Sequence, residues 1–232
     1  MTGGGAGGHR RTVALVAARD EEAIVGQTVN ALRRLPLDEI VVVDDGSTDA
    51  TSAEALSAGA TVLRIRGHAG KGGAMEGAIQ RLPPADVWLF ADADLGSSAA
   101  GLEALLDVVA SGRADLAIAM FPAQPGGGFG MVKRSSAAAI RLLTRFQVEE
   151  PLSGQRVVTG ACLAAVRPLA GGFGIETAMT IDAVRAGFRV LEVPVPGLTH
   201  RPTGRSLRGF AHRARQGAQI GLAATARAVR LR

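Results

Sequence analysis

The sequence predicts an α/β fold with a mostly parallel central sheet that carries helices on both faces. Short runs rich in apolar and β-branched residues alternate with stretches of helical spacing over roughly the first 120 residues, which is typical of a parallel sheet. Of the 232 residues, 47% are hydrophobic and 20% are charged, so the chain resembles a globular protein with a sizeable core. Polar and acidic residues directly follow several apolar runs, at the edge of the sheet where ligands bind in such folds.

Five apolar runs in the first half are predicted to be buried strands, because each is short and rich in Val, Ile, Leu or Ala. These strands are residues 12–18, 39–44, 60–65, 86–91 and 114–119. The stretches between them have helical spacing or begin with helix-capping residues. The predicted helices are residues 21–35, Ser47 or Thr48 to about Ala58, 70–82 and 98–111. Pro36 ends the first helix, and Pro83 and Pro84 end the third.

The second half is less regular. Residues 121–131 are rich in Gly and Pro and lack periodicity, so they are predicted to form a mobile loop or a lid. The elements predicted after it are a helix at about 132–146, a strand-like stretch near 156–166, a helix at 175–186, a strand at 189–195 and a basic helix from about 205.

Positive charge is concentrated at the end of the chain. The sequence has 26 Lys and Arg against 21 Asp and Glu, a net charge of +5, and subtracting the eight arginines from Arg201 onward leaves −3 for the first 200 residues. Nucleic acid, an anionic membrane surface and a phosphorylated substrate are the partner classes that such a tail fits. Aromatic residues make up only 3% of the chain, which argues against a base-stacking platform, so no nucleic acid is expected.

We expect one domain with two short flanking segments. Residues 1–11 are Gly-rich and are predicted to be a disordered leader, residues 12–200 to form the domain, and residues 201–232 to form a basic helical tail. No apolar run reaches the roughly 18 residues of a membrane helix, and the start lacks the apolar region of a signal peptide. The single cysteine, Cys162, excludes an internal disulfide framework and fits a reducing compartment.

Two carboxylates follow the predicted strand 86–91. Asp92 and Asp94 are spaced to share one divalent cation, directly or through a nucleotide diphosphate, and hard oxygen ligands suit Mg²⁺ or Mn²⁺. A solvated turn is the alternative for an isolated D-x-D pattern. Because the pair follows a buried strand and lies beside a second acidic strand end, the metal site is favoured.

The strand 39–44 and the helix 70–82 carry two further motifs. Asp44 and Asp45 precede Gly46 and Ser47, and their carboxylates are suited to accept hydrogen bonds from a base and a ribose hydroxyl, although Asp and Ser are also common at helix starts. Lys71 is one of only two lysines in a chain with 24 arginines, and it lies in a Gly-rich helix start. This placement favours a compact ammonium near a phosphate group.

Four segments, in this order and spacing, resemble the nucleotide-sugar half of family 2 glycosyltransferases with the GT-A fold. They are VALVAARDEE (13–22), IVVVDDGSTDAT (40–51), GKGGAMEGAI (70–79) and WLFADADL (88–95). The resemblance covers residues 12–96 closely and implies that residues 97–200 form the acceptor half. In that half, GFGIE (172–176) followed by a distant His-Arg resembles glucosyl-3-phosphoglycerate synthases, whereas PLSGQR (151–156) and EVPV (192–195) resemble polyprenyl-phosphate sugar synthases.

The resemblance also implies residue roles. Those assigned to the nucleotide sugar are Ala17, Ala18, Asp20 and Glu21 around the base and ribose, Asp45 at the base, Lys71 near the uridine or diphosphate, and Asp92 at the ribose or metal. Asp94 would ligate the metal, with His200 as a third ligand or a diphosphate contact. The family usually has Pro at the start of the first loop and Asn before Glu, where this chain has Ala17 and Asp20.

Glu176 is predicted to be catalytic together with Asp94, through a contact to sugar hydroxyls. It lies at a predicted helix start, where a carboxylate that only stabilises the helix dipole is the alternative. Arg201 and Arg205 are predicted to bind the acceptor. The basic tail as a whole could equally pack on the domain or lie on an anionic bilayer.

The function that these features favour is transfer of a hexose from a nucleoside-diphosphate sugar, UDP-linked, to a phosphate-bearing acceptor such as a phosphoglycerate, with Mg²⁺ or Mn²⁺. A polyprenyl-phosphate glycosyltransferase at the membrane surface is the first alternative. A sugar nucleotidylyltransferase is less favoured because residues 19–23 lack a Gly-rich activating loop, and a non-catalytic nucleotide-binding module is the last alternative. We expect a cytoplasmic enzyme, with peripheral contact to the inner membrane face and homodimer formation as further expectations.

Overall fold

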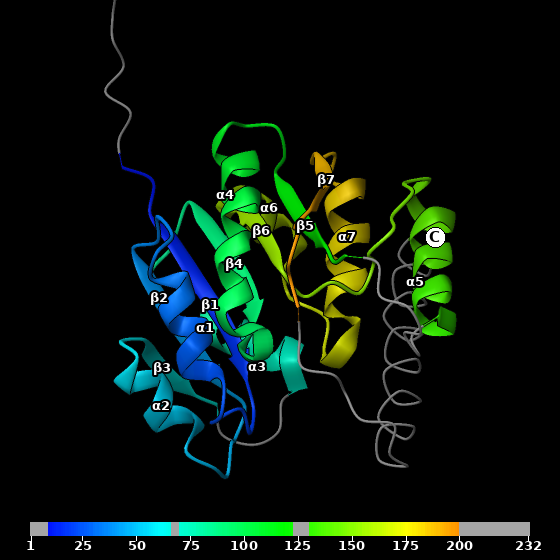
Figure 1. Ribbon diagram of the computed structural model, residues 1–232. Coiled ribbons are helices and arrows are strands. Elements are labelled where there is room, and N and C mark those ends of the chain that lie inside the picture. Colours follow the sequence, from blue (N-terminus) through cyan, green and yellow to red (C-terminus); the bar gives the residue numbers. More distant parts are fainter. Residues whose placement is uncertain (1–8, 66–69, 123–129, 200–232) are drawn as a thin grey trace, which may run out of the picture.

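The computed structural model describes residues 9–65, 70–122 and 130–199. A seven-stranded sheet with the order β3-β2-β1-β4-β6-β5-β7 forms the centre of the fold (Figure 1). The strands are β1 (Thr12–Ala18), β2 (Glu39–Asp44), β3 (Thr61–Arg64), β4 (Val87–Asp92), β5 (Leu116–Met120), β6 (Arg156–Thr159) and β7 (Val190–Pro194). Strand β6 runs antiparallel to its neighbours, β4 and β5, and the other pairs of strands in the described ranges are parallel. The predicted α/β fold with a mostly parallel sheet is confirmed.

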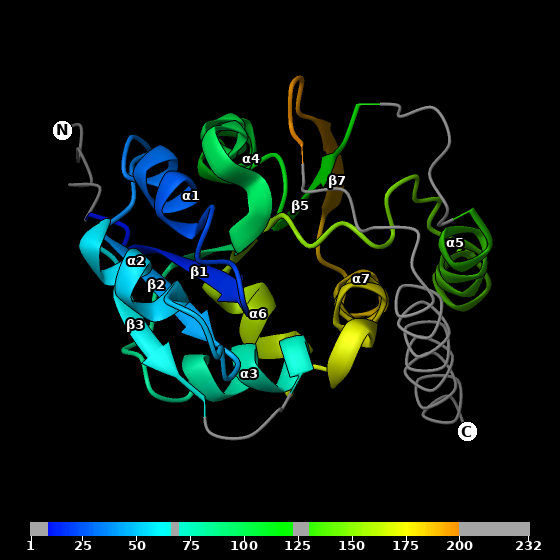
Figure 2. The ribbon, with the colours of Figure 1, turned by 60° about the horizontal axis from the view of Figure 1, so that its bottom comes forward.

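Helices cover both faces of the sheet (Figure 2). The α-helices are α1 (Val25–Leu32), α2 (Thr51–Ser57), α3 (Gly70–Ile79), α4 (Glu103–Ala110), α5 (Gly130–Thr144), α6 (Gly160–Val166) and α7 (Ile175–Arg185), and two 3₁₀ helices span Ala93–Leu102 (η1) and Gly172–Gly174 (η2). One hydrophobic core lies between the sheet and α1, α2, η1 and α4, and a second lies between the sheet and α3, α6 and α7.

The apolar runs are strands because both of their faces are buried. In β1, Ala14 and Val16 point into the first core, whereas Val13 and Leu15 point into the second. Successive side chains of a strand alternate between faces, so a strand with a core on each side needs a continuous apolar run. Helix α5 lies outside these two layers and packs on α7 around Ile140, Val148 and Ile181.

Several element boundaries differ from those predicted. The helix predicted at 21–35 spans only Val25–Leu32, and the backbone N–H groups of Asp20, Glu21 and Glu22 bind side chains of the segment that follows β2. Neither Ser47 nor Thr48 caps α2, whose N-cap residue is Ala50. The helix predicted at 98–111 is instead a 3₁₀ helix kinked at Gly96, followed by α4. The predicted strand 156–166 ends at Thr159, whose hydroxyl accepts a hydrogen bond from the N–H of Cys162 and starts α6.

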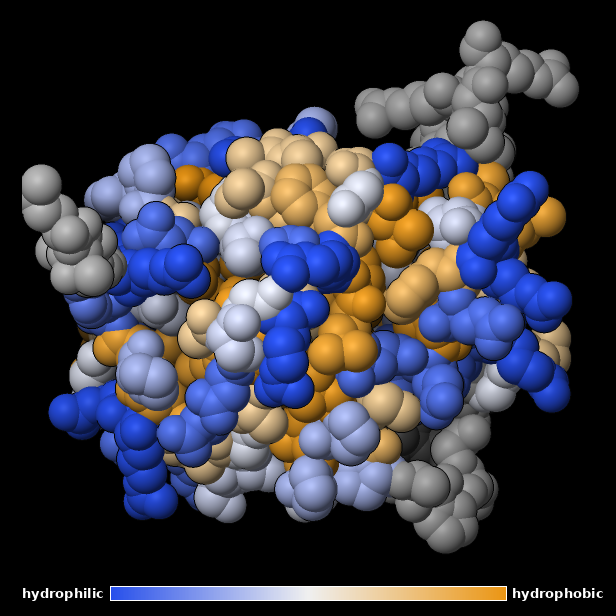
Figure 3. Space-filling view, turned by 90° about the horizontal axis from the view of Figure 1, so that it is seen from above, coloured by the Kyte–Doolittle hydropathy of each residue, from blue (hydrophilic) through white to orange (hydrophobic). Residues whose placement is uncertain are grey.

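Some predicted features lie outside the described residues. They are most of the leader, the greater part of the 121–131 loop, and the tail from residue 200 onward. Within the described ranges, no helix is both long enough and apolar enough to cross a membrane. Figure 3 looks from above onto the end of the molecule where the chain enters β1, and hydrophilic side chains there surround an area of hydrophobic ones.

Candidate active site

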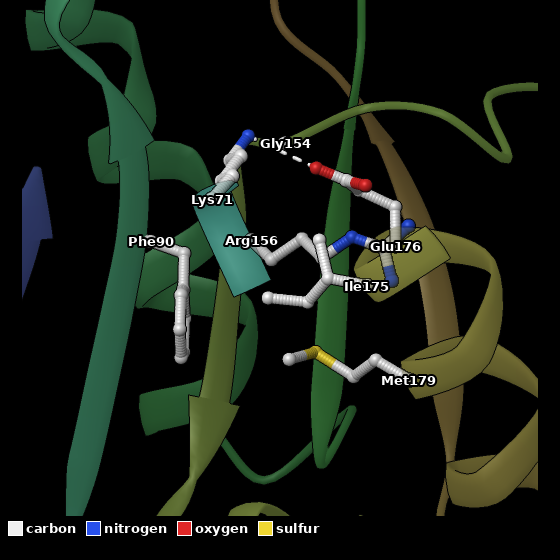
Figure 4. A pocket seen from close by; sticks show the side chains of 7 residues that line it. All are labelled: Lys71, Phe90, Gly154, Arg156, Ile175, Glu176 and Met179. Carbon is white, nitrogen blue, oxygen red and sulfur yellow. Dashed lines mark ion pairs between the residues drawn. The ribbon is translucent and has the colours of Figure 1, made fainter. Parts of the chain in front are cut away.

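The centre of the candidate site is Lys71, which is held between two carboxylates. Its ammonium lies 2.6 Å from Oδ1 of Asp92 at the end of β4, and 2.9 Å from Oε1 of Glu176 in the first turn of α7. Figure 4 shows the side chains of Lys71 and Glu176 pointing toward one another from α3 and α7. Burial disfavours the charged amine, but the two carboxylates outweigh it and raise the pKa of Lys71, so its positive charge is retained.

The residues just before β6 pack against the Lys71–Asp92–Glu176 group. Because β6 is antiparallel, Gly154 and Gln155 approach the edge of the sheet at which the parallel strand β4 ends. The Gln155 amide donates a 2.8 Å hydrogen bond to Oδ2 of Asp92. A Cβ atom at Gly154 would lie 2.7 Å from the same oxygen and closer still to the Lys71 ammonium. The absence of a side chain at Gly154 therefore lets the backbone pass against the ion pair.

Asp94 is half-buried in the first turn of η1, and α1 braces this turn. The buried Thr28 hydroxyl donates to the carbonyl of Ala93 at 2.7 Å and accepts from the N–H of Gly96 at 2.8 Å. Gly96 has a φ of 55°, a left-handed conformation that favours glycine. These contacts fix the backbone that presents Asp94 next to Asp92.

Asp20 joins the loops that follow β1 and β2. Its N–H donates to the Ser47 hydroxyl at 3.0 Å, and its Oδ1 accepts from the N–H of Thr48 at 2.8 Å. Asp20 has a φ of 54°, which Asp and Asn tolerate better than most residues. An Asn side-chain oxygen could accept the same hydrogen bonds, so the departure from the usual family residue preserves this link between the loops.

The remaining nucleotide-site residues lie along the same loops. Glu21 donates its N–H to the Thr51 hydroxyl at 2.8 Å, which continues the link between the loops. Ala17 and Ala18 are the last residues of β1, and Asp45 is a buried residue directly after β2. The predicted nucleotide residues therefore all lie at the edge of the sheet where the parallel strands end. Their contacts to a nucleotide stay predictions.

Asp44, in contrast, is committed to the protein interior. It is fully buried and accepts hydrogen bonds from Ser47 N–H at 2.7 Å and from the Ser52 hydroxyl, with Arg64 3.4 Å away. Burial acts to raise the pKa of Asp44, but these hydrogen bonds and Arg64 outweigh it and hold the pKa below its usual value. Asp44 thus organises the loop, whereas Asp45, the next residue, is the carboxylate predicted to contact the base.

Asp92 and Asp94 supply the hard oxygen atoms that Mg²⁺ and Mn²⁺ prefer. Within residues 9–65, 70–122 and 130–199, no group of three or more His, Cys, Asp or Glu side chains is arranged to hold a metal ion. Two carboxylates nevertheless fit a cation of this kind, because Mg²⁺ is commonly held by one or two carboxylates together with substrate phosphates and water. The predicted third ligand, His200, and the predicted acceptor residues Arg201 and Arg205 lie outside the described residues.

Thr28, Gly154, Gln155 and Arg156 were not predicted as site residues. Gly154, Gln155 and Arg156 lie within the PLSGQR segment that carries part of the resemblance, which was the available signal for them. Thr28 occurs among apolar residues at helical spacing and has no signal of its own in the sequence.

Comparison with known proteins identifies the family. The sequence matches the family described as glycosyl transferase family 2 over residues 13–167, which is more than half of the chain. The chain belongs to glycosyl transferase family 2.

Two curated relatives are similar over most of this chain. Glycosyltransferase AglJ of Haloferax volcanii is 26% identical over 184 residues, which are 78% of this chain and 60% of that protein. Glucosyl-3-phosphoglycerate synthase of Mycolicibacterium paratuberculosis is 28% identical over 198 residues, which are 74% of this chain and 60% of that protein. The chain thus spans three fifths of the length of these relatives.

Solved structures of the glucosyl-3-phosphoglycerate synthase from Mycobacterium tuberculosis have the same fold. Its complex with Mg²⁺ and uridine diphosphate is 25% identical, with a TM-score of 0.79 over 94% of this chain and 79% of that one. Its complex with Mn²⁺, UDP-glucose and glycerol 3-phosphate is also 25% identical, with a TM-score of 0.77 over 94% of this chain and 80% of that one.

Proposed function

We propose that this family 2 protein transfers a hexose from a nucleoside-diphosphate sugar, UDP-glucose in the first instance, to a phosphate-bearing acceptor such as a phosphoglycerate. The observation that carries the proposal is the Lys71–Asp92–Glu176 group at the carboxyl edge of the sheet, with Asp94 two residues after Asp92. The similar synthases support the choice of donor, metal and acceptor, because their solved complexes contain UDP-glucose, a divalent cation and a phosphorylated three-carbon compound.

A divalent cation, Mg²⁺ or Mn²⁺, would neutralise negative charge on the diphosphate as the sugar leaves. Asp94 would hold this cation, and Asp92 and His200 are the further ligands that we propose. Asp92 accepts a hydrogen bond from Gln155 on one oxygen and binds Lys71 through the other. These two contacts orient the Asp92 carboxylate at the end of β4, where we propose that it meets the cation.

The chain's own residues divide into a donor side and a transfer side. On the donor side, Glu21 and Asp45, in the loops after β1 and β2, would contact the base and ribose, and Asp20 holds the two loops together. On the transfer side, Lys71 brings a fixed positive charge and Glu176 a carboxylate suited to accept hydrogen bonds from sugar hydroxyls.

In the reaction, the bond between the anomeric carbon and the β-phosphate oxygen breaks, and a bond from that carbon to the acceptor oxygen forms. The acceptor hydroxyl releases its proton to water, and the nucleoside diphosphate leaves with the electron pair of the broken bond. A positioned cation and ammonium act where charge develops on the leaving group, which is the largest contribution expected of such a site.

Mass spectrometry of the reaction products tests this proposal. The protein is incubated with UDP-glucose and Mn²⁺, with 3-phosphoglycerate, a polyprenyl phosphate or no acceptor, and parallel reactions contain GDP-mannose or EDTA. We expect a hexosyl-phosphoglycerate and UDP, formed only in the presence of the cation. If hexose were transferred only to polyprenyl phosphate, the proposed phosphoglycerate acceptor would be wrong and polyprenyl phosphate would take its place. A protein that consumes no nucleotide sugar under any of these conditions would contradict the proposal.

A further inference from the structure

Arg156 is a buried cation that makes no ion pair with any described residue. Its exposed fraction is 2%, and it lines the pocket that Lys71 and Glu176 also line (Figure 4). None of the ion pairs formed within the described ranges includes it. Burying a charge is costly, so the hydrogen bonds of this guanidinium and the attraction of the Glu176 and Glu192 carboxylates have to stabilise it.

All three nitrogen atoms of the guanidinium donate to oxygen atoms of the protein. Nε donates to the carbonyl of Ser153 at 2.8 Å, one terminal nitrogen to the Thr180 hydroxyl at 2.9 Å, and the other to the carbonyl of Pro151 at 3.3 Å. The guanidinium is planar and rigid, so it fixes the relative positions of these three oxygen atoms. A lysine ammonium on a flexible stem would not fix them in the same way.

Two of these bonds hold the turn that carries Gly154. This turn lies between a segment fastened to β7 and the start of β6. At its beginning, the Glu192 carboxylate accepts from the N–H groups of Glu149 and Glu150 at 2.8 and 2.6 Å. At its end, Gly154 and Gln155 lie against Asp92. Arg156 therefore fixes the middle of the segment that closes the ion-pair group.

The third bond reaches the helix that carries Glu176. Thr180 is fully buried, and its hydroxyl donates to the carbonyl of Glu176 at 3.0 Å while it accepts from Arg156. Thr180 lies one helical turn after Glu176, so its position sets that of the first turn of α7. Through this hydroxyl, Arg156 joins two segments that approach Lys71 from different sides.

We propose that Arg156 is a positioning residue that holds the Gly154 turn and the Glu176 turn of α7 in the mutual placement that the Lys71–Asp92–Glu176 group requires. The inference deepens the proposed function, and its kinetic test rests on that function. Its structural test does not rest on that function, because the two turns hold their mutual placement in the protein without substrate.

The first test uses Thr180, which joins Arg156 to α7. Thr180→Val removes the hydroxyl but keeps the shape of the side chain, whereas Thr180→Ser keeps the hydroxyl. We expect kcat to fall about tenfold in Thr180→Val, with KM for UDP-glucose within about threefold, because the loops after β1 and β2 bind the base and ribose. Thr180→Ser should restore kcat to within about threefold of the wild type. Equal kcat in the Val and Ser variants would overturn the proposal.

The second test measures hydrogen–deuterium exchange of the protein without substrate. In Arg156→Met, the amides of residues 151–155 and of the first turns of α7 should exchange at least about tenfold faster, while those of β1 and β2 should not change. Unchanged exchange in both segments would overturn the positioning role. If the wild type transferred no sugar, the proposed function would fail, yet this comparison would still test the placement. If Arg156→Met did not fold, the same exchange experiment on Thr180→Val would test the positioning role. In that variant, the amides of the first turns of α7 should exchange faster, and those of residues 151–155 should not change.

Discussion

Sugar transfer is expected to fall by at least about a thousandfold in kcat/KM when Asp94 is replaced by alanine, a loss of about 4 kcal/mol of transition-state stabilisation. Asp94 is presented at the end of β4 by a turn that Thr28 fixes on both sides. Removing its carboxylate leaves Asp92 as the one carboxylate of the pair, and Asp92 is already engaged by Lys71 and Gln155. The cation would then be bound weakly and charge on the leaving diphosphate would lack its partner.

Initial rates at increasing Mn²⁺ concentrations measure this effect. Asp107→Ala is the matched control, because Asp107 is an exposed carboxylate on α4. The control should keep the wild-type rate and the wild-type dependence on Mn²⁺. An Asp94→Ala variant with kcat/KM within about threefold of the wild type and the same Mn²⁺ dependence would show that Asp94 does not hold the cation.

Replacing Gly154 with alanine is expected to lower kcat/KM by about a hundredfold, because displacement of a catalytic group by about 1 Å has costs of this size. The added Cβ would lie 2.7 Å from Oδ2 of Asp92 and closer still to the Lys71 ammonium, so one of these groups has to move. Either movement separates charges that are now paired at 2.6 Å.

Steady-state kinetics and thermal unfolding of the same preparations separate this effect from loss of the fold. Gly130→Ala is the control, since a Cβ at Gly130 would meet no atom of the described residues within 4 Å and Gly130 lies at the start of α5. We expect the control to keep its activity. Gly154→Ala with unchanged kcat/KM would mean that the close packing around Lys71 does not matter for transfer.

The strands could be predicted from the sequence because burial on both faces imposes an uninterrupted apolar run. The bounds predicted for the first two strands, 12–18 and 39–44, are those of β1 and β2. The helix starts were predicted less well. Ser47 and Thr48, which were predicted to cap α2, instead bind Asp20 in the loop after β1. A contact between segments this far apart in the chain leaves no local sequence pattern.

In the candidate site, too, residues set by one local segment could be predicted, whereas contacts between distant segments could not. Asp92 and Asp94 could be predicted to lie together because they follow one strand, and the carboxyl ends of parallel strands share an edge. The pairing of Lys71 with Glu176 could not be derived from spacing, since the two residues are more than a hundred positions apart. Gly154, Gln155 and Arg156 depend on β6, which enters the sheet against the direction of its neighbours.

Calorimetric titration of the protein with UDP, in the presence of Mn²⁺ and again with EDTA, tests most directly whether this edge of the sheet is a metal-dependent nucleotide-diphosphate site. We expect Mn²⁺ to tighten UDP binding by at least about tenfold, equivalent to about 1.4 kcal/mol, because Asp92 and Asp94 would hold the cation against the diphosphate. UDP that binds equally well in EDTA, or does not bind at all, would contradict it.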